Sequence, residues 1–172
     1  MKKLLVVVDM QNDFVTGALG TAEAVAIVPA VVERVERAAA AGEDIIFTQD
    51  THAPDYMDTQ EGRNLPVPHC IKDSEGWQII PQLQEYTARR MCVEKPTFGS
   101  MHLANLAMMS EYEEIELIGL CTDICVISNA MLLKAALPEA RLSVDSKCCA
   151  GVTPTSHANA LEAMKMCQIT VK

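Results

Sequence analysis

The stretch "LIGLCTDICVISNA", residues 117–130, joins a strand-like run to a helix-like segment and places two cysteines at the junction. The apolar residues before Cys121 favour a β-strand, whereas the apolar residues after Cys125 recur with helical spacing. A strand that leads directly into a helix is the repeating unit of α/β folds. The two cysteines could form a disulfide, bind a metal, fill a core or include a nucleophile, and the rest of the chain has to distinguish these roles.

The same alternation continues in both directions from this junction. We expect strands at residues 4–8, 44–48, 91–94, 115–120, 142–145 and 169–171, and helices at 25–41, 77–88, 100–109, 122–137 and 154–167. This order predicts an α/β fold of βαβ units, with a mostly parallel sheet and helices on both faces. Residues 49–76 contain Pro, Gly, His and Asp without periodicity, which predicts a long functional loop. We find no linker and no repeat, and expect residues 1–172 to form one domain.

Composition limits the classes of function. Apolar residues make up 49% of the 172 residues, which is enough for a core and too much for a disordered chain. The formal net charge of −9 argues against a nucleic-acid partner and gives no reason to expect a membrane partner. The apolar run at residues 4–8 is too short for a signal peptide, so we expect a cytoplasmic protein. Seven cysteines are then mostly free thiols.

Polar or reactive residues follow four of the predicted strands. These groups are Asp9, residues 49–52, residues 94–95 and residues 121–125. In parallel α/β sheets, ligands bind beyond the carboxyl ends of the strands. Four such groups at corresponding positions predict a functional site at that edge of the sheet.

Cys125 is the candidate nucleophile among the cysteines. With Thr122 as the N-cap, it falls in the first turn of the predicted helix, where the helix dipole favours a thiolate. The alternative is a buried structural cysteine. For Cys121 we expect a role in packing and in the backbone. The C-x3-C spacing does not fit a thioredoxin-like redox pair, and adding Cys148 and Cys149 does not give the usual spacing of a zinc site.

Asp9 and Lys95 are the candidate partners of this cysteine. Asp9 ends a strand that is predicted to be fully buried, so its carboxylate is either a general base or a structural acid bound by loop amides. Lys95 follows the third strand, and either points into the same crevice or lies in solvent. In the crevice, its positive charge would stabilise both a carboxylate and a thiolate.

The predicted loop contains a candidate metal site. Asp50, His52 and His69 supply one carboxylate and two imidazoles, which suits zinc, iron or manganese. The D-x-H spacing is a weak indication, and polar residues of a surface loop are the alternative. His102 and His157 fall on predicted helices, where we expect them at the surface or at a helix end.

Several stretches together resemble a known family. "VVVDMQNDF" (6–14), "TQDTH" (48–52), "LPVPHC" (65–70), "EKPTFGS" (94–100), "GLCTDICV" (119–126) and "CAGVTPTSHANALEAMKMC" (149–167) are similar, in this order, to the isochorismatase-like cysteine hydrolases, which include nicotinamidase. The resemblance covers nearly the whole chain. It implies a three-layer α/β/α sandwich with strand order 3-2-1-4-5-6, in which the first and fourth strands are neighbours.

The resemblance also implies a mechanism. It assigns Asp9, Lys95 and Cys125 as a catalytic triad that cleaves a small, nicotinamide-like amide through a thioester acyl-enzyme. It implies a cis peptide bond just before Cys121, and an oxyanion hole formed by the backbone amides of Cys121 and Cys125. Phe14 matches an aromatic residue of the substrate pocket.

Two departures from nicotinamidases concern the metal and the substrate. The usual third histidine is absent from residues 53–58, and Glu61 is the candidate ligand that would complete a site for one divalent ion. The tryptophan that usually flanks the pyridine ring is absent from residues 64–70. Nicotinamide therefore stays one candidate among small amides.

The sequence leaves other functions open. An isochorismatase-type hydrolase of a non-amide substrate and a non-catalytic binding module are the alternatives. An aspartyl-phosphate phosphohydrolase would need D-x-D after the first strand, where this chain has Asp9-Met10-Gln11.

The resemblance implies a homo-oligomer, and the methionine-rich helices predicted at 100–109 and 122–137 offer a surface for it. On this surface we expect Met101, Met108, Met109, Met131, Leu132 and Leu133.

Overall fold

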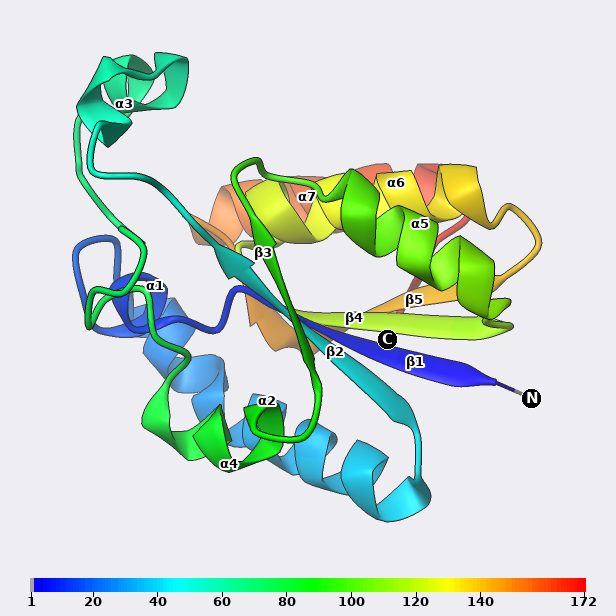
Figure 1. Cartoon of the computed structure of the whole chain (residues 1–172). Coiled ribbons are helices and arrows are strands. Elements are labelled where there is room, and N and C mark those ends of the chain that lie inside the picture. The colour runs from blue at the N-terminus through cyan, green and yellow to red at the C-terminus, as the bar shows by residue number, and fades with distance from the viewer. Residues whose placement is uncertain (1) are drawn as a thin grey trace.

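The computed structural model describes residues 2–172 and contains a six-stranded sheet in the order β3-β2-β1-β4-β5-β6 (Figure 1). All neighbouring strands pair in parallel. The predicted fold class and strand order are thus confirmed. The strands are β1 (Lys3–Val8), β2 (Asp44–Asp50), β3 (Met91–Lys95), β4 (Glu114–Leu120), β5 (Arg141–Ala150) and β6 (Thr170–Val171).

Helices cover both faces of this sheet. In Figure 1, α2 and α4 lie below the sheet, whereas α5, α6 and α7 lie above it. The helices are α1 (Asn12–Val15), α2 (Ala22–Ala41), α3 (Gln60–Asn64), α4 (Gln84–Thr87), α5 (Met101–Ser110), α6 (Ile127–Ala136) and α7 (Pro154–Met166). Within residues 2–172, no helix combines the length and the apolar character needed to cross a membrane.

The central strand β1 explains why its sequence is apolar without interruption. Leu5 and Val7 belong to the core on the α2 side of the sheet. Leu4, Val6 and Val8 belong to the core beneath α5, α6 and α7. Because alternate side chains enter two different cores, every position of the strand has to be apolar. The first polar residue after the strand therefore lies at the side of the sheet that is formed by the carboxyl ends of the strands.

Strands β1 and β4 approach each other closely at their carboxyl ends. Gly119 has φ = 113°, and a Cβ atom at this position would lie 2.1 Å from the carbonyl oxygen of Val8. Only glycine combines this conformation with such a close approach. The strand ends that precede Asp9 and Cys121 are consequently held side by side.

The structure corrects some predicted boundaries. Strand β5 runs from Arg141 to Ala150, beyond the predicted 142–145, because a register shift relative to β4 allows pairing to resume after an irregularity. The predicted loop at 49–76 contains a 3-10 turn at Tyr56–Asp58 and the short helix α3, which stands away from the sheet in Figure 1. These elements are too short to give a periodic pattern.

Pro81 begins a turn, and the helix expected at 77–88 is confined to the short helix α4. Pro81–Leu83 forms a 3-10 turn that leads into α4. Proline suits the first turn of a helix, where no N–H is needed for an intrahelical hydrogen bond.

Candidate active site and metal centre

Asp9 follows β1 directly and is fully buried. Its Oδ1 accepts a 2.6 Å hydrogen bond from the Thr48 hydroxyl, and its Oδ2 lies 2.6 Å from the Lys95 ammonium nitrogen. Apart from this ion pair, Oδ2 accepts no hydrogen bond from the described residues. Burial and the charge of Asp50 raise the pKa of Asp9, although Lys95 lowers it. A buried carboxylate with a free acceptor position and a raised pKa suits proton transfer.

Lys95 reaches this carboxylate from β3, two strands away from β1. Only 1% of its side chain is exposed, and its Nζ donates hydrogen bonds to the Cys125 sulfur at 3.4 Å and the Thr97 carbonyl at 3.1 Å. Burial lowers the pKa of Lys95, but Asp9, with further contributions from Cys125 and Asp50, raises it overall. The long side chain thus brings a stable cation between the Asp9 carboxylate and the Cys125 thiol.

Cys125 lies in a π-helical turn at Thr122–Val126. The expectation that Thr122 is the N-cap is wrong, because the turn begins after Cys121. The Val126 N–H donates a 3.0 Å hydrogen bond to the Cys121 carbonyl, five residues earlier. This wider, π-type turn replaces the first turn of an α-helix. The structure nevertheless places Cys125 beside Lys95, so this lysine points into the crevice and not into solvent.

The surroundings of the Cys125 thiol disfavour its ionisation. Burial and the charge of Asp9 raise its pKa well above the ordinary value, and Lys95 only partly offsets them. Desolvation is the largest influence on the pKa of this thiol, and it opposes the effect that the sequence predicts for a helix start. Asp9 is the carboxylate whose charge acts most strongly on this thiol.

Cys121 contributes a backbone feature at the same place. The Leu120–Cys121 peptide bond is cis, as the resemblance implied. Among residues 2–172, no hydrogen bond is donated by the Cys121 amide, and none runs from the Cys125 amide to an acceptor outside its own turn. Burial, aided by the charges of Asp123 and Asp9, raises the pKa of the Cys121 thiol to about 12. Its amide is thus available, whereas the raised pKa disfavours ionisation of its thiol.

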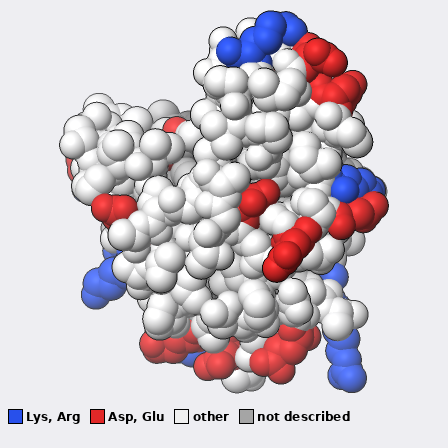
Figure 2. Space-filling model, turned by 90° about the vertical axis from the view of Figure 1, so that its left-hand side faces the viewer, with Lys and Arg blue, Asp and Glu red and all other residues white. Residues whose placement is uncertain are grey.

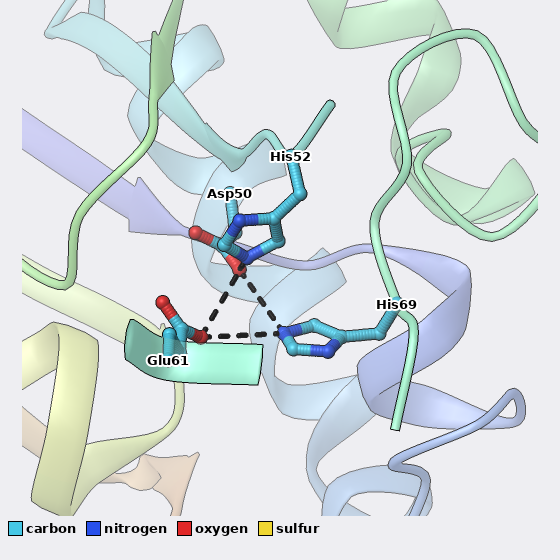
Figure 3. Close-up of side chains that lie close together, drawn as sticks. All are labelled: Asp50, His52, Glu61 and His69. Atoms are coloured by element: carbon cyan, nitrogen blue, oxygen red, sulfur yellow. Dashed lines mark hydrogen bonds and ion pairs between the residues drawn. The ribbon is translucent and has the colours of Figure 1, made fainter. Parts of the chain in front are cut away.

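The four predicted metal ligands come together next to this group (Figure 3). One ligand atom each from Asp50, His52, Glu61 and His69 lies within 4.8 Å of the other three. The two histidine Nε2 atoms lie 2.9 and 3.4 Å from Asp50 Oδ2, and 3.6 and 3.7 Å from Glu61 Oε1. Ligand bonds of about 2.0–2.1 Å in a tetrahedral site put donor atoms about 3.3 Å apart. The donor spacing therefore fits a divalent ion.

The chemistry of the donors agrees with their spacing. The Nδ1 atom of His69 lies 2.8 Å from the Val67 carbonyl oxygen, and donation of its proton there leaves Nε2 free as a ligand. Burial raises the pKa of Asp50, but its contacts with His52 and His69 and the charge of Lys95 bring it below its usual range. Two imidazoles and two carboxylates suit zinc, iron or manganese.

Two polar residues after β1 hold the loop that carries these ligands. Gln11 accepts a 2.8 Å hydrogen bond from the Asp50 N–H and donates one of 2.8 Å to the Asp50 carbonyl. The Asp13 carboxylate accepts a 2.8 Å hydrogen bond from the Cys70 N–H. The four candidate metal ligands are consequently tied to the same strand end as Asp9.

The surroundings of the site are mostly uncharged. Phe14, the predicted pocket aromatic, lies beside His69 with ring centroids 5.6 Å apart. Figure 2 shows the face onto which the carboxyl ends of the strands open, where white residues predominate, some acidic side chains lie near the centre and other charged side chains lie towards the margins.

Two residues near Cys125 make contacts that the sequence did not predict. Half-buried His157 lies at the helix end expected for it, in the first turn of α7, and shares a 2.7 Å hydrogen bond with Thr122. Buried Asn129 donates a 2.8 Å hydrogen bond to the Cys125 carbonyl and accepts one of 2.9 Å from the Ser100 N–H. The position of Asn129, four residues after Cys125, was the only indication in the sequence.

Comparison with known proteins agrees with this arrangement. A pyrazinamidase of Pyrococcus horikoshii, solved in complex with zinc, is 25% identical, with a TM-score of 0.87 over 100% of this chain and 99% of its own. The isochorismatase family protein PncA of Bacillus subtilis is 29% identical over 94% of this chain and 93% of its own length. The nicotinamidase/pyrazinamidase of Mycobacterium tuberculosis is 25% identical over 97% and 96%, respectively.

The match to the family itself is continuous. The family described as "Isochorismatase domain" matches residues 3–172, which include both the candidate active site and the metal cluster. The chain therefore belongs to the isochorismatase family.

Proposed function

We propose that this protein is an amidase that hydrolyses the C–N bond of a small primary amide through a thioester on Cys125. The observation that carries the proposal is the position of Lys95 Nζ, 2.6 Å from Asp9 Oδ2 and 3.4 Å from Cys125 Sγ. This contact groups a base, a cation and a thiol in one buried site. The names of the relatives, nicotinamidase and pyrazinamidase, make nicotinamide the first substrate to test.

The first half of the reaction forms the acyl-enzyme. Asp9 takes the thiol proton, and the Cys125 sulfur attacks the amide carbonyl carbon. The carbonyl oxygen becomes an oxyanion, which the amides of Cys121 and Cys125 stabilise, typically by about 2.7–4 kcal/mol per donor. Asp9 then gives its proton to the nitrogen, the C–N bond breaks, and ammonia leaves.

The second half releases the acid. Asp9, again ionised, takes a proton from water, and the resulting hydroxide attacks the thioester carbonyl. The C–S bond breaks, and the sulfur recovers the proton from Asp9. Lys95 stays protonated throughout and stabilises the negative charge as it moves between carboxylate and sulfur.

The metal cluster has a separate place in this proposal. Asp50, His52, Glu61 and His69 would hold one divalent ion, which when bound supplies a Lewis acid that orients an electron-pair donor of the substrate. Lys95 Nζ lies 3.6 Å from Asp50 Oδ1, so the cluster adjoins the triad. Phe14, beside His69, would contact a flat acyl group.

A screen of small primary amides for ammonia release tests the function. Nicotinamide is included, and each assay is repeated after chelator treatment. We expect Cys125→Ala to lose turnover while its circular dichroism spectrum stays that of the wild type, and the matched variant Cys121→Ala to keep most activity. Iodoacetamide labelling with mass mapping should find Cys125 as the dominant site of substrate-protected modification. Full turnover by Cys125→Ala would overturn the proposal.

A further inference from the structure

Thr122 connects the proposed oxyanion hole to α7, a helix that lies much later in the sequence. It is the first residue of the π-helical turn and follows Cys121, whose amide is the proposed donor. Its side chain is fully buried, and its Oγ1 shares a 2.7 Å hydrogen bond with Nδ1 of His157, 35 residues further along the chain. Burial lowers the pKa of His157, although Asp123 opposes this, so the imidazole is neutral near pH 7.

The beginning of α7 holds this imidazole in place. Thr153 and Ser156 cap the helix reciprocally, with hydrogen bonds of 3.1 Å and 3.0 Å between each side chain and the other backbone N–H. The His157 N–H donates to the Thr153 carbonyl at 2.9 Å. A Cβ atom at Gly151 would lie 2.9 Å from the Cβ of His157, so the preceding chain packs directly against this residue.

A second contact joins the same two segments. The Asp123 carboxylate accepts a hydrogen bond from the Val152 N–H, at 3.1 and 3.2 Å from its two oxygens. Thr122 and Asp123, the two residues that follow Cys121, are therefore both anchored to residues 151–157. The position at which the turn begins is set from α7 as well as from β4.

The contacts of the sulfur come from the opposite direction. Lys95 approaches Cys125 from β3, and Asp9 acts on it from the end of β1. An anchor on Thr122 thus acts on the start of the turn without touching the groups that deprotonate the thiol.

We propose that His157 is a positioning residue, which holds the Cys121 amide in the oxyanion hole through its hydrogen bond to Thr122. This inference rests on the proposed function, because it takes Cys125 as the nucleophile. The bond acts on the oxygen of the transition state and leaves the reactivity of the sulfur unchanged.

Matched variants separate the hydrogen bond from side-chain size. Thr122→Val and His157→Leu remove the bond, whereas Thr122→Ser and His157→Asn keep a polar group at the bonding position. We expect each of the first two to lower kcat about tenfold with little change in KM, since a displaced oxyanion donor weakens only transition-state binding. The double variant should be no worse than either single one. His102→Leu, an exposed histidine on α5, is the control.

Two further readouts distinguish positioning from general damage. The rate of Cys125 alkylation by iodoacetamide should stay at the wild-type value, because no oxyanion forms in that reaction. Inhibition by the aldehyde that matches the amide found in the screen should weaken by the same factor as kcat. In that adduct the sulfur bonds to the carbonyl carbon, the thiol proton passes to Asp9, and the oxyanion faces the two amides.

The results that would overturn the role of His157 differ from those that would overturn the proposed function. Wild-type kcat in folded Thr122→Val, or alkylation slowed as much as turnover, would overturn the role of His157 while Cys125 remains the labelled nucleophile. Turnover by Cys125→Ala would overturn the proposed function itself. If His157→Leu does not fold, the nearly isosteric Thr122→Val decides, with folding followed by circular dichroism.

Discussion

The ammonium nitrogen of Lys95 lies 3.4 Å from the sulfur of Cys125, although β3 and β4 are separated by two strands. Lys95→Gln should therefore lower kcat at least a hundredfold, because it removes the charge that stabilises both the Asp9 carboxylate and the developing thiolate. Iodoacetamide alkylation should slow as well. Lys72→Gln is the matched control, since that lysine is half exposed and pairs with Glu94 at the surface. A Lys95→Gln enzyme with the wild-type rate would remove the lysine from the mechanism.

The pH dependence of activity should report Asp9. This carboxylate has to be ionised to accept the thiol proton, and burial raises its pKa above the ordinary value of 3.8. As a result, kcat/KM should rise with pH through that raised pKa and fall away below it. The hydrogen bond from Thr48 lowers the pKa of Asp9, so Thr48→Val should move the acid limb to higher pH, whereas Thr48→Ser should not. An unmoved acid limb in Thr48→Val would assign it to another group.

Metal content should depend on Glu61. Elemental analysis of protein purified without added metal should find up to one divalent ion per chain. Glu61→Gln should weaken binding at least tenfold, because it replaces a charged ligand that lies 3.6 and 3.7 Å from the two histidine nitrogens. Glu94→Gln, at an exposed glutamate, is the control. Full activity of metal-free protein would show that the four residues serve only to order the loop.

Assembly is a further proposal, and the exposed side of α5 supports it. Met101, Met108 and Met109 are 62%, 48% and 80% exposed, and the helix has no charged residue. Of the residues expected on this surface, Leu133 is fully buried and belongs to the core. Light scattering should give a dimer or larger particle, and Met108→Glu should dissociate it through unpaired buried charges. Met166→Glu is the control, at a methionine exposed on α7. A wild-type mass near 18.8 kDa at micromolar concentration would contradict the proposal.

The sequence predicted the alternating strands and helices and the functional residues at the carboxyl ends of the strands. Strand β1 is apolar at each position between Leu4 and Val8, so its end at Asp9 is plain in the sequence. The same holds for Lys95 at the end of β3 and for Cys125 after β4. In a parallel sheet the carboxyl ends share one edge, which brings Asp9 and Cys125 close on neighbouring strands, and the long side chain of Lys95 reaches them from β3.

Contacts between distant segments could not be predicted in this way. The hydrogen bond between Thr122 and His157 depends on where α7 begins, and nothing in the local pattern of either residue indicates it. The raised pKa of the Cys125 thiol could not be predicted from the sequence either. Helix position is visible in a sequence, whereas the degree of burial that raises the pKa of this thiol depends on packing from several elements.

Gly119 has a consequence for how variants of this protein are read. The space for its side chain is occupied by the carbonyl of Val8, one residue before the candidate base. Any larger residue would push apart the two strands whose ends carry Asp9 and the cysteine turn. In a mutational scan, position 119 would thus score like a member of the active site, although it has no group that could take part in chemistry. Intolerance to substitution at this edge of the sheet measures the spacing of the backbone as much as the identity of the reacting side chains.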